Sequence, residues 1–207
     1  MKYKFYENNN NKLIIFFNGW GMDEIIISHL DKEDYDLLIF YDYRDLDIDF
    51  PNLDKYKEKY IVGWSMGVMI STLFDNEFGN IKKYIAINGT PKPIDDEYGI
   101  PTRVYKLTVR GFNQSSCQKF MERMFDNIPP INKFSNRSLD SQKEELQNLM
   151  GVEGRYVSFD KVIISDNDKI IPTKNQLNYW KNPVIINKIE GGHCPFFKFS
   201  KWSEILW

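Results

Sequence analysis

Short apolar runs separated by helix-length segments dominate the first ninety residues of the chain. The run at 12–17 (Lys-Leu-Ile-Ile-Phe-Phe) is continuously apolar, as is typical of a parallel strand buried on both faces. Strands are predicted at 2–6 (an edge strand), 12–17, 35–41, 60–64 and 81–88, and helices at 24–30, 53–59 and 66–74. Strands that alternate with helices at this spacing indicate an α/β fold with a mostly parallel sheet and helices on both faces.

The alternation stops in residues 94–156, which contain no convincing buried strand. Helical patterns are predicted there instead, at 112–127 and 139–150. Sheet-like sequence then returns, with predicted strands at 159–165 and 184–189 and predicted helices at 173–180 and 195–206. We therefore expect a core made of residues 1–93 and 157–207, and a helical cap insertion at 94–156 that lies over the carboxyl edge of the sheet.

Each predicted insertion helix carries an apolar stripe. The stripe residues are Phe120, Met121, Met124 and Phe125 in the first helix, and Leu146, Leu149 and Met150 in the second. Such a stripe either packs against the sheet or forms the wall of an acyl pocket. The spacing alone favours packing.

Composition is that of a globular domain, with 207 residues, 42% hydrophobic and 15% aromatic. A net charge of −2 gives no reason to expect binding to nucleic acid or a membrane. No run has transmembrane length or the form of a signal peptide. Cys117 and Cys194 make neither a disulfide scaffold nor a metal-like spacing. We expect a cytoplasmic protein without a metal or another cofactor.

The run Gly63-Trp64-Ser65-Met66-Gly67 joins a predicted strand to a predicted helix. This is the G-x-S-x-G pattern of a nucleophile elbow in the strand–turn–helix context that the motif requires. Side chains at positions 63 and 67 would collide with the neighbouring strand and helix, so glycine is needed at both. We predict that the turn exposes the Ser65 Oγ above the sheet. The alternative is a tight turn in which Ser65 caps the helix.

A serine hydroxyl becomes a nucleophile when a base takes its proton, and that base is usually a histidine oriented by a carboxylate. The chain holds two histidines. His29 lies in a polar stretch without other candidate groups, so we assign it to the surface. His193 follows the last predicted strand behind two glycines, on a loop that can reach the sheet edge. The order of Ser65, an acid and then His193 matches the order of these groups in elbow hydrolases.

The acid is expected in the loop after the strand at 159–165, where Asp166 and Asp168 compete. In this fold the acid commonly precedes a short apolar pair and a proline, and Asp168-Lys169-Ile170-Ile171-Pro172 has that form. We therefore favour Asp168. Asp166 remains the alternative, or it hydrogen-bonds the turn.

Two backbone amides are candidates for an oxyanion hole. The Met66 amide directly follows the nucleophile. The second donor in such hydrolases comes from a loop after an early buried strand, and Asn18-Gly19-Trp20-Gly21 follows the strand at 12–17. The Trp20 amide is our candidate. The alternative is an ordinary turn with Trp20 packed in the core.

Arginine is concentrated in the insertion, which holds five of the six arginines of the chain. Between Tyr98 and Leu139 there are seven basic and two acidic residues, a net charge of +5. Clustered arginine in a lysine-rich chain favours recognition of phosphate or carboxylate. A solvated helix face with local ion pairs is the alternative.

Together, these motifs resemble the α/β-hydrolases over nearly the whole chain. The combination of Asn18-Gly19-Trp20-Gly21, Gly63-Trp64-Ser65-Met66-Gly67, Asp168-Lys169-Ile170-Ile171-Pro172 and Gly191-Gly192-His193 is more narrowly similar to the pimeloyl-[acyl-carrier protein] methyl ester esterases of biotin synthesis. The resemblance is to their short BioG type. The BioH type is similar but usually has histidine where this chain has Asn18.

This resemblance implies hydrolysis of the methyl ester of pimeloyl-[acyl-carrier protein], with release of methanol. Ser65, His193 and Asp168 would form the catalytic triad, and the amides of Trp20 and Met66 would hold the oxyanion. Acyl-carrier proteins are acidic, so the basic insertion would supply docking residues. The candidates for this role are Arg110, Arg123 and Arg137.

Two other functions are compatible with the sequence. A general short-chain carboxylesterase or acyl thioesterase would use the same triad, with incidental arginines. A non-catalytic binding protein of the same fold is disfavoured because nucleophile, acid and base are all present in order.

Overall fold

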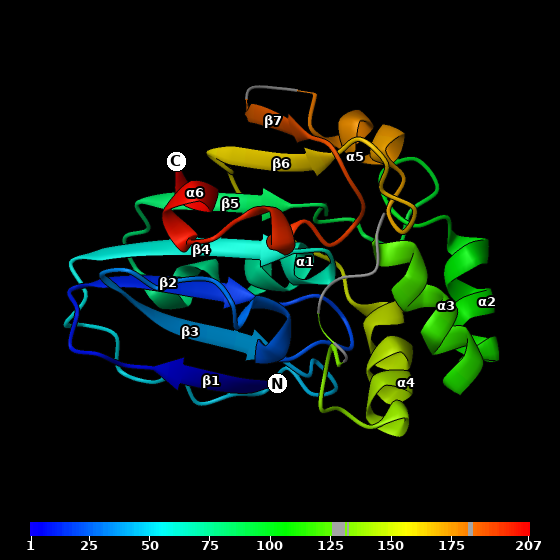
Figure 1. Ribbon diagram of the computed structural model, residues 1–207, viewed down its shortest axis with the longest axis horizontal. Helices are drawn as coiled ribbons and strands as arrows, with labels where there is room; N and C mark the ends of the chain where they lie inside the picture. The colour runs from blue at the N-terminus through cyan, green and yellow to red at the C-terminus, as the bar shows by residue number, and fades with distance from the viewer. Residues whose placement is uncertain (126–130, 132, 182–183) are drawn as a thin grey trace.

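The computed structural model describes residues 1–125, 131, 133–181 and 184–207, and these form one sheet with helices on both faces (Figure 1). The seven strands lie in the order β1-β3-β2-β4-β5-β6-β7. Only β1 is antiparallel to its neighbour, and it forms the edge strand that the sequence predicted. The strands are β1 (Lys2–Tyr6), β2 (Lys12–Phe17), β3 (Tyr35–Tyr41), β4 (Glu58–Trp64), β5 (Lys83–Ile87), β6 (Lys161–Ser165) and β7 (Ile185–Ile189).

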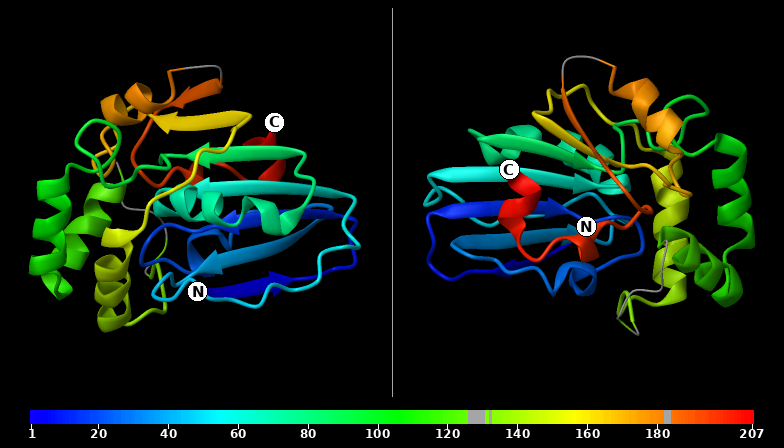
Figure 2. Two further views of the ribbon diagram at one scale, coloured as in Figure 1. Left: turned by 180° about the vertical axis from the view of Figure 1, so that it is seen from behind. Right: turned by 45° about the horizontal axis from the view of Figure 1, so that its top comes forward.

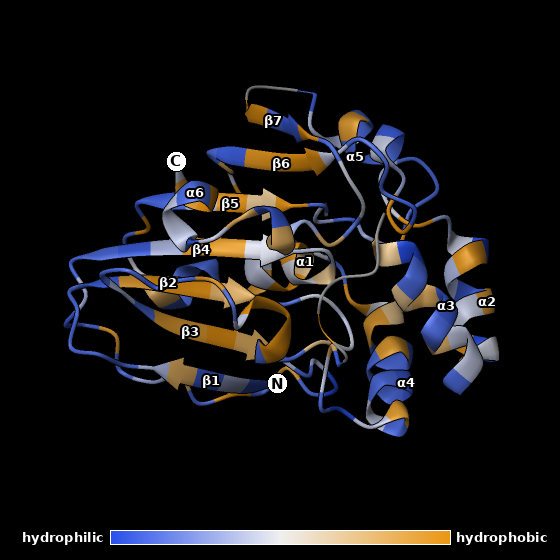
Figure 3. Cartoon of the chain, viewed as in Figure 1, coloured by the Kyte–Doolittle hydropathy of each residue, from blue (hydrophilic) through white to orange (hydrophobic). Residues whose placement is uncertain are grey.

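The central strands are largely apolar because both of their faces are covered. Figure 3 shows apolar residues in β2 to β6, with hydrophilic residues at the start of β4. One face packs under α1 (Met66–Leu73), η2 (Asp75–Phe78) and α5 (Thr173–Tyr179). The other face packs under η1 (Glu24–Ile27), η4 (Phe196–Lys198) and α6 (Trp202–Leu206). Figure 2 shows α1 and α6 on opposite sides of the sheet. The predicted three-layer α/β architecture is confirmed.

Helices α2 (Thr102–Gly111), α3 (Gln114–Met124) and α4 (Leu139–Asn148) lie between β5 and β6 in the chain, and η3 (Leu149–Gly151) follows α4. They stand beyond the carboxyl ends of the parallel strands (Figure 1). The sequence did not predict α2, which buries only Tyr105 and Val109. The predicted end of the first insertion helix at Asn127 lies outside the described residues.

Two helix predictions are wrong, and strand pairing explains both. No helix forms at 53–59, because β4 already begins at Glu58 and pairs with Lys12 of β2. The helix predicted at 195–206 is divided into η4 and α6. Lys201 forms a parallel β-bridge with Asp31. The backbone at this point therefore makes its hydrogen bonds outside a helix, and the helix is interrupted.

Candidate active site

Ser65 occupies a strained turn between β4 and α1, with φ of 57° and ψ of −123°. A Cβ atom at Gly67 would lie 2.1 Å from the Phe17 carbonyl oxygen, and one at Gly63 would lie 2.7 Å from the Val68 Cα. Both glycines are therefore required, as the sequence predicted. Gly89 after β5 is equally constrained, because its Cβ would lie 2.5 Å from the Ser65 carbonyl oxygen. This third contact was not foreseen.

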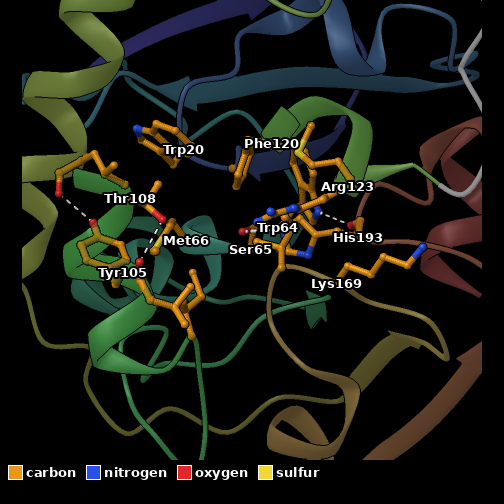
Figure 4. Close-up of a pocket in the computed structure, with 16 residues that line it drawn as sticks. Trp20, Trp64, Ser65, Met66, Tyr105, Thr108, Phe120, Arg123, Lys169 and His193 are labelled. Atoms are coloured by element: carbon orange, nitrogen blue, oxygen red, sulfur yellow. Dashed lines mark hydrogen bonds between the residues drawn. The ribbon is translucent and has the colours of Figure 1, made fainter. Parts of the chain in front are cut away.

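The imidazole of His193 lies between Ser65 and Asp168. Its Nε2 is 2.8 Å from the Ser65 Oγ, and its Nδ1 is 2.8 Å from the Asp168 Oδ2. All three residues are buried, and Figure 4 shows Ser65 and His193 side by side at the pocket. The Ser65 hydroxyl makes no capping bond to α1. The geometry therefore favours the elbow over the helix cap that was its alternative.

Asp168 is held on the imidazole by donors on both carboxylate oxygens. Its Oδ1 accepts hydrogen bonds from the amides of Ile170 and Ile171 at 2.8 and 3.0 Å, and its Oδ2 accepts one from the Gln176 Nε2 at 2.8 Å. The exposed Asp166 instead accepts a hydrogen bond from the Gly191 amide at 2.9 Å. Of the two candidates, the structure places Asp168 at the histidine and Asp166 in the turn.

The loop that carries His193 is fixed by two side chains that the sequence reading did not single out. The Trp64 Nε1 and the Asn88 Nδ2 each donate to the His193 carbonyl oxygen at 2.9 Å. Asn88 is fully buried with a positive φ of 42°, and its Oδ1 accepts a hydrogen bond from the Ser165 amide at 2.7 Å. The sequence offers one signal for this role, a polar residue directly after the buried strand β5.

The loop after β2 shapes the second candidate donor. Asn18 is buried, and its side chain accepts from the Gly19 amide at 2.9 Å and donates to the Asp23 carbonyl at 2.7 Å. Within the described part of the chain, the amides of Trp20 and Met66 have no protein acceptor. Both residues line the same pocket as Ser65. The arrangement leaves the two amides available to an oxyanion.

The Trp20 side chain behaves as its alternative reading predicted. It is buried, and its ring meets Phe112 and Phe120 edge-on at centroid distances of 5.3 and 4.9 Å. Its Nε1 donates to the Gln142 carbonyl of α4 at 2.7 Å. A packed indole and an available amide are therefore compatible in one residue.

Residues of all three insertion helices line the pocket above Ser65 (Figure 4). Its lining from these helices comprises Val104, Tyr105 and Thr108 of α2, Phe120, Arg123 and Met124 of α3, and Leu146 of α4. Lys169 and Arg123 are its cations. Phe120 and Met124 also pack against the core, so the α3 stripe serves both as packing and as pocket wall. Met150 of the second stripe is 42% exposed and does neither.

The three candidate arginines have different environments. Arg110 is exposed on α2, and the exposed Arg123 reaches the pocket. The interpretation of Arg137 as a docking residue is wrong, because its side chain is 6% exposed and pairs with Asp42 at 2.9 Å and Glu145 at 2.5 Å. A guanidinium held by two buried carboxylates is not presented to a partner.

Other candidate chemistry is sparse. His29 is exposed and stacks on Phe197 at 4.6 Å, as expected for a surface residue. Cys117 and Cys194 are free thiols. Among the described residues, no cluster of histidine, cysteine and acidic side chains could hold a metal ion. No helix in this part of the chain is long and apolar enough to cross a membrane.

Comparison with known proteins gives a family match over nearly the whole chain. Residues 1–205 match the family described as BioG, pimeloyl-ACP methyl esterase. The crystal structure of BioG from Haemophilus influenzae has a TM-score of 0.91 and 33% identity, and 99% of each chain is covered. MGS-M2, an alpha/beta hydrolase enzyme from a deep-sea metagenome library, has a TM-score of 0.63 and 14% identity over 95% of this chain and 88% of that one. The α/β-hydrolase fold predicted from the sequence is thereby confirmed.

A second similarity is to part of a longer protein. A malonyl-[acyl-carrier protein] O-methyltransferase of Bacteroides fragilis is 37% identical over 190 residues. The alignment covers 87% of this chain and 39% of that protein.

Proposed function

The chain belongs to the BioG family of pimeloyl-ACP methyl esterases and is a carboxylic ester hydrolase, and we propose that it hydrolyses the methyl ester of pimeloyl-[acyl-carrier protein]. The products are pimeloyl-[acyl-carrier protein] and methanol. One observation carries the proposal: in a chain of this family, the Ser65 Oγ lies 2.8 Å from the His193 Nε2 at the floor of a largely apolar pocket.

In the acylation step, the Ser65 Oγ attacks the methyl ester carbonyl while the His193 Nε2 takes the hydroxyl proton. The Asp168 carboxylate stabilises the imidazolium that forms. Collapse of the tetrahedral intermediate breaks the bond to the methoxy group, which leaves as methanol with the proton from His193. The pimeloyl chain is then esterified to Ser65.

Deacylation reverses the roles with water in place of methanol. His193 takes a proton from water, whose oxygen attacks the acyl carbonyl. The bond to the Ser65 Oγ breaks, the hydroxyl regains its proton from His193, and a free carboxyl group is released. In both steps the amides of Trp20 and Met66 stabilise the oxyanion, each contributing about 3 kcal/mol to lowering the barrier.

We assign residues 94–156 as the cap that selects the substrate. The apolar side chains of α2 and α3 suit the methylene chain of a pimeloyl group. Arg110 lies on a face of α2 that exposes Leu107 at 56% and also Val104, a residue that lines the pocket, at 48%. A basic face with exposed apolar side chains suits an acidic carrier protein, with Arg123 at the pocket beneath it.

The likeness to a named methyltransferase supports a carrier-bound methyl ester as substrate. A malonyl-[acyl-carrier protein] O-methyltransferase forms the kind of ester that this chain would cleave. Free thiols at Cys117 and Cys194 agree with a reducing cytoplasm as the site of the reaction.

Steady-state hydrolysis of two substrates tests the proposal. We expect kcat/KM for pimeloyl-[acyl-carrier protein] methyl ester to exceed that for free monomethyl pimelate at least tenfold, since binding energy from the carrier is absent in the free ester. Equal values would favour the general carboxylesterase instead. Ser65→Ala should abolish both activities and should fail to restore growth without biotin in a strain lacking its own esterase.

A further inference from the structure

The buried face of α4 carries two polar side chains, Gln142 and Glu145, at positions where an amphipathic helix normally places apolar ones. The Glu145 side chain has no exposed surface. A buried carboxylate costs free energy unless it is paired and hydrogen-bonded, and apolar residues would pack the helix as well. Packing alone therefore does not explain why a carboxylate occupies this position.

The contacts of Glu145 cross from the insertion to the core. Its Oε2 accepts a hydrogen bond from the Gly21 amide at 3.0 Å, and its Oε1 accepts one from the Tyr43 amide at 2.7 Å. The Arg137 Nη1 lies 2.5 Å from the same Oε2. Three donors thus satisfy the carboxylate. Two of these donors are backbone groups of loops at the sheet edge.

The helix holds the Trp20 loop at a second point. The Trp20 Nε1 donates to the Gln142 carbonyl at 2.7 Å, one turn before Glu145 on the same helix. The two bonds fix the Trp20 side chain and the peptide that follows Trp20. Gly19 and Gly21 flank this residue, and Gly21 has a φ of 76°, so neither neighbour of Trp20 has a side chain that could restrain the peptide.

We infer that Glu145 is a positioning residue that acts through the Gly21 peptide to aim the Trp20 amide at the oxyanion. This inference rests on the proposed role of the Trp20 amide but not on the identity of the acyl group. An oxyanion donor works only when it is held in place before charge develops. The insertion helix α4 is therefore part of the catalytic framework as well as a wall of the pocket.

Kinetics of two variants with p-nitrophenyl butyrate test the inference. Glu145→Gln retains the size but replaces one acceptor oxygen with a donor. Glu145→Asp keeps the charge for Arg137 but draws the carboxylate away from Gly21. Both should lower kcat about 10- to 100-fold with KM within about twofold, because misplacing one donor affects the transition state and not ground-state binding.

The matched control is Glu144→Gln on the same helix. Glu144 is 57% exposed and pairs with Arg44, so this variant should keep the wild-type kcat. A second readout separates positioning from general loosening of the structure. Affinity for an alkyl trifluoromethyl ketone, which forms an oxyanion with Ser65, should fall in step with kcat, while affinity for the corresponding secondary alcohol should stay unchanged.

Wild-type kcat in either folded Glu145 variant would overturn the inference, and so would an equal loss of affinity for the ketone and the alcohol. If both variants fail to fold, amide hydrogen exchange of the wild-type protein decides. The inference predicts that the Gly21 amide, which donates to the Glu145 Oε2, exchanges as slowly as α4, and faster independent exchange of this amide contradicts it. An inactive wild-type enzyme would instead count against the proposed function.

Discussion

The sheet edge and the insertion contribute to the same pocket with different kinds of contact. At the sheet edge, hydrogen bonds hold the polar residues of the site in place. Asp168 accepts three hydrogen bonds, and the His193 carbonyl accepts two. Helices α2 and α3 offer the pocket mostly apolar side chains, and α2 leaves Val104 and Leu107 exposed. The sheet edge therefore positions Ser65, His193 and Asp168, and in the proposed function the insertion selects what reaches them.

Helix α4 differs from α2 in this respect. It is joined to the core by Glu145 and by the Gln142 carbonyl, while the exposed face of α2 has no comparable buried polar contact among the described residues. The comparison predicts that substitutions at the sheet edge affect kcat or folding. Substitutions on α2 should instead affect binding of the carrier substrate.

The largest effect is expected at Asp168. In Asp168→Asn the amide cannot hold the His193 Nδ1–H and stabilise the imidazolium, so kcat should fall about 10⁴-fold. Asp166→Asn is the matched control. In the described part of the chain, the Asp166 side chain accepts a hydrogen bond from the Gly191 amide of the turn and makes none to His193. Equal losses in the two variants would mean that the acid has been assigned wrongly.

Two glycines, Gly67 and Gly111, should differ in how their replacement by alanine changes the free energy of unfolding. Gly67→Ala brings a Cβ to 2.1 Å from the Phe17 carbonyl oxygen, and we expect the free energy of unfolding to fall by about 3 kcal/mol. Gly111→Ala at the end of α2 meets no atom within 4 Å and should raise it by up to about 1 kcal/mol. Denaturant titration measures both. A neutral Gly67→Ala would show that the elbow tolerates a side chain.

The junction between the two regions should respond to pH. Burial would raise the pKa of Asp42, but Arg44, Arg137 and Lys2 together lower it to about 2. Because this pKa is below the unfolded value, the stabilisation is present above about pH 4 and is lost as pH falls towards 2. Asp42→Asn should therefore lower the free energy of unfolding by about 2 kcal/mol at pH 7.

The same difference should shrink towards zero at pH 2. Asparagine suits this position because Asp42 has a φ of 59°, which asparagine tolerates. A difference that does not change between pH 7 and pH 2 would exclude the charge of Asp42 as its cause.

The smallest effect is expected on α2. Arg110→Ala should raise KM for the carrier-bound ester about fivefold at low salt, less at high salt, and leave hydrolysis of p-nitrophenyl butyrate unchanged. Lys57→Ala is the control, because the exposed Lys57 precedes β4 at the end of the sheet opposite the site. Equal increases in KM for the two variants would contradict the proposal that the carrier protein docks on α2.

The sequence predicted the sheet more completely than the insertion, for a physical reason. Runs such as Lys12–Phe17 and Tyr35–Tyr41 are mostly apolar because the strand is buried on both faces, so their bounds could be read directly. Helix α2 buries only two side chains and was missed. Its contacts are made with other parts of the fold, which a local pattern does not record.

The candidate site divides in the same way. Ser65, Asp168 and His193 lie in local motifs whose spacing is informative by itself. Glu145, Asn88 and the burial of Arg137 depend on contacts between residues far apart in the chain. Nothing in a single sequence separates a buried, paired arginine from an exposed one.

Labelling with a fluorophosphonate tests most directly whether Ser65 is a nucleophile activated by His193. Mass spectrometry of the digested protein should locate the adduct on Ser65, and His193→Ala should label at least 100-fold more slowly while remaining folded. An unlabelled Ser65 in the folded wild type, or labelling of His193→Ala at the wild-type rate, would contradict the account.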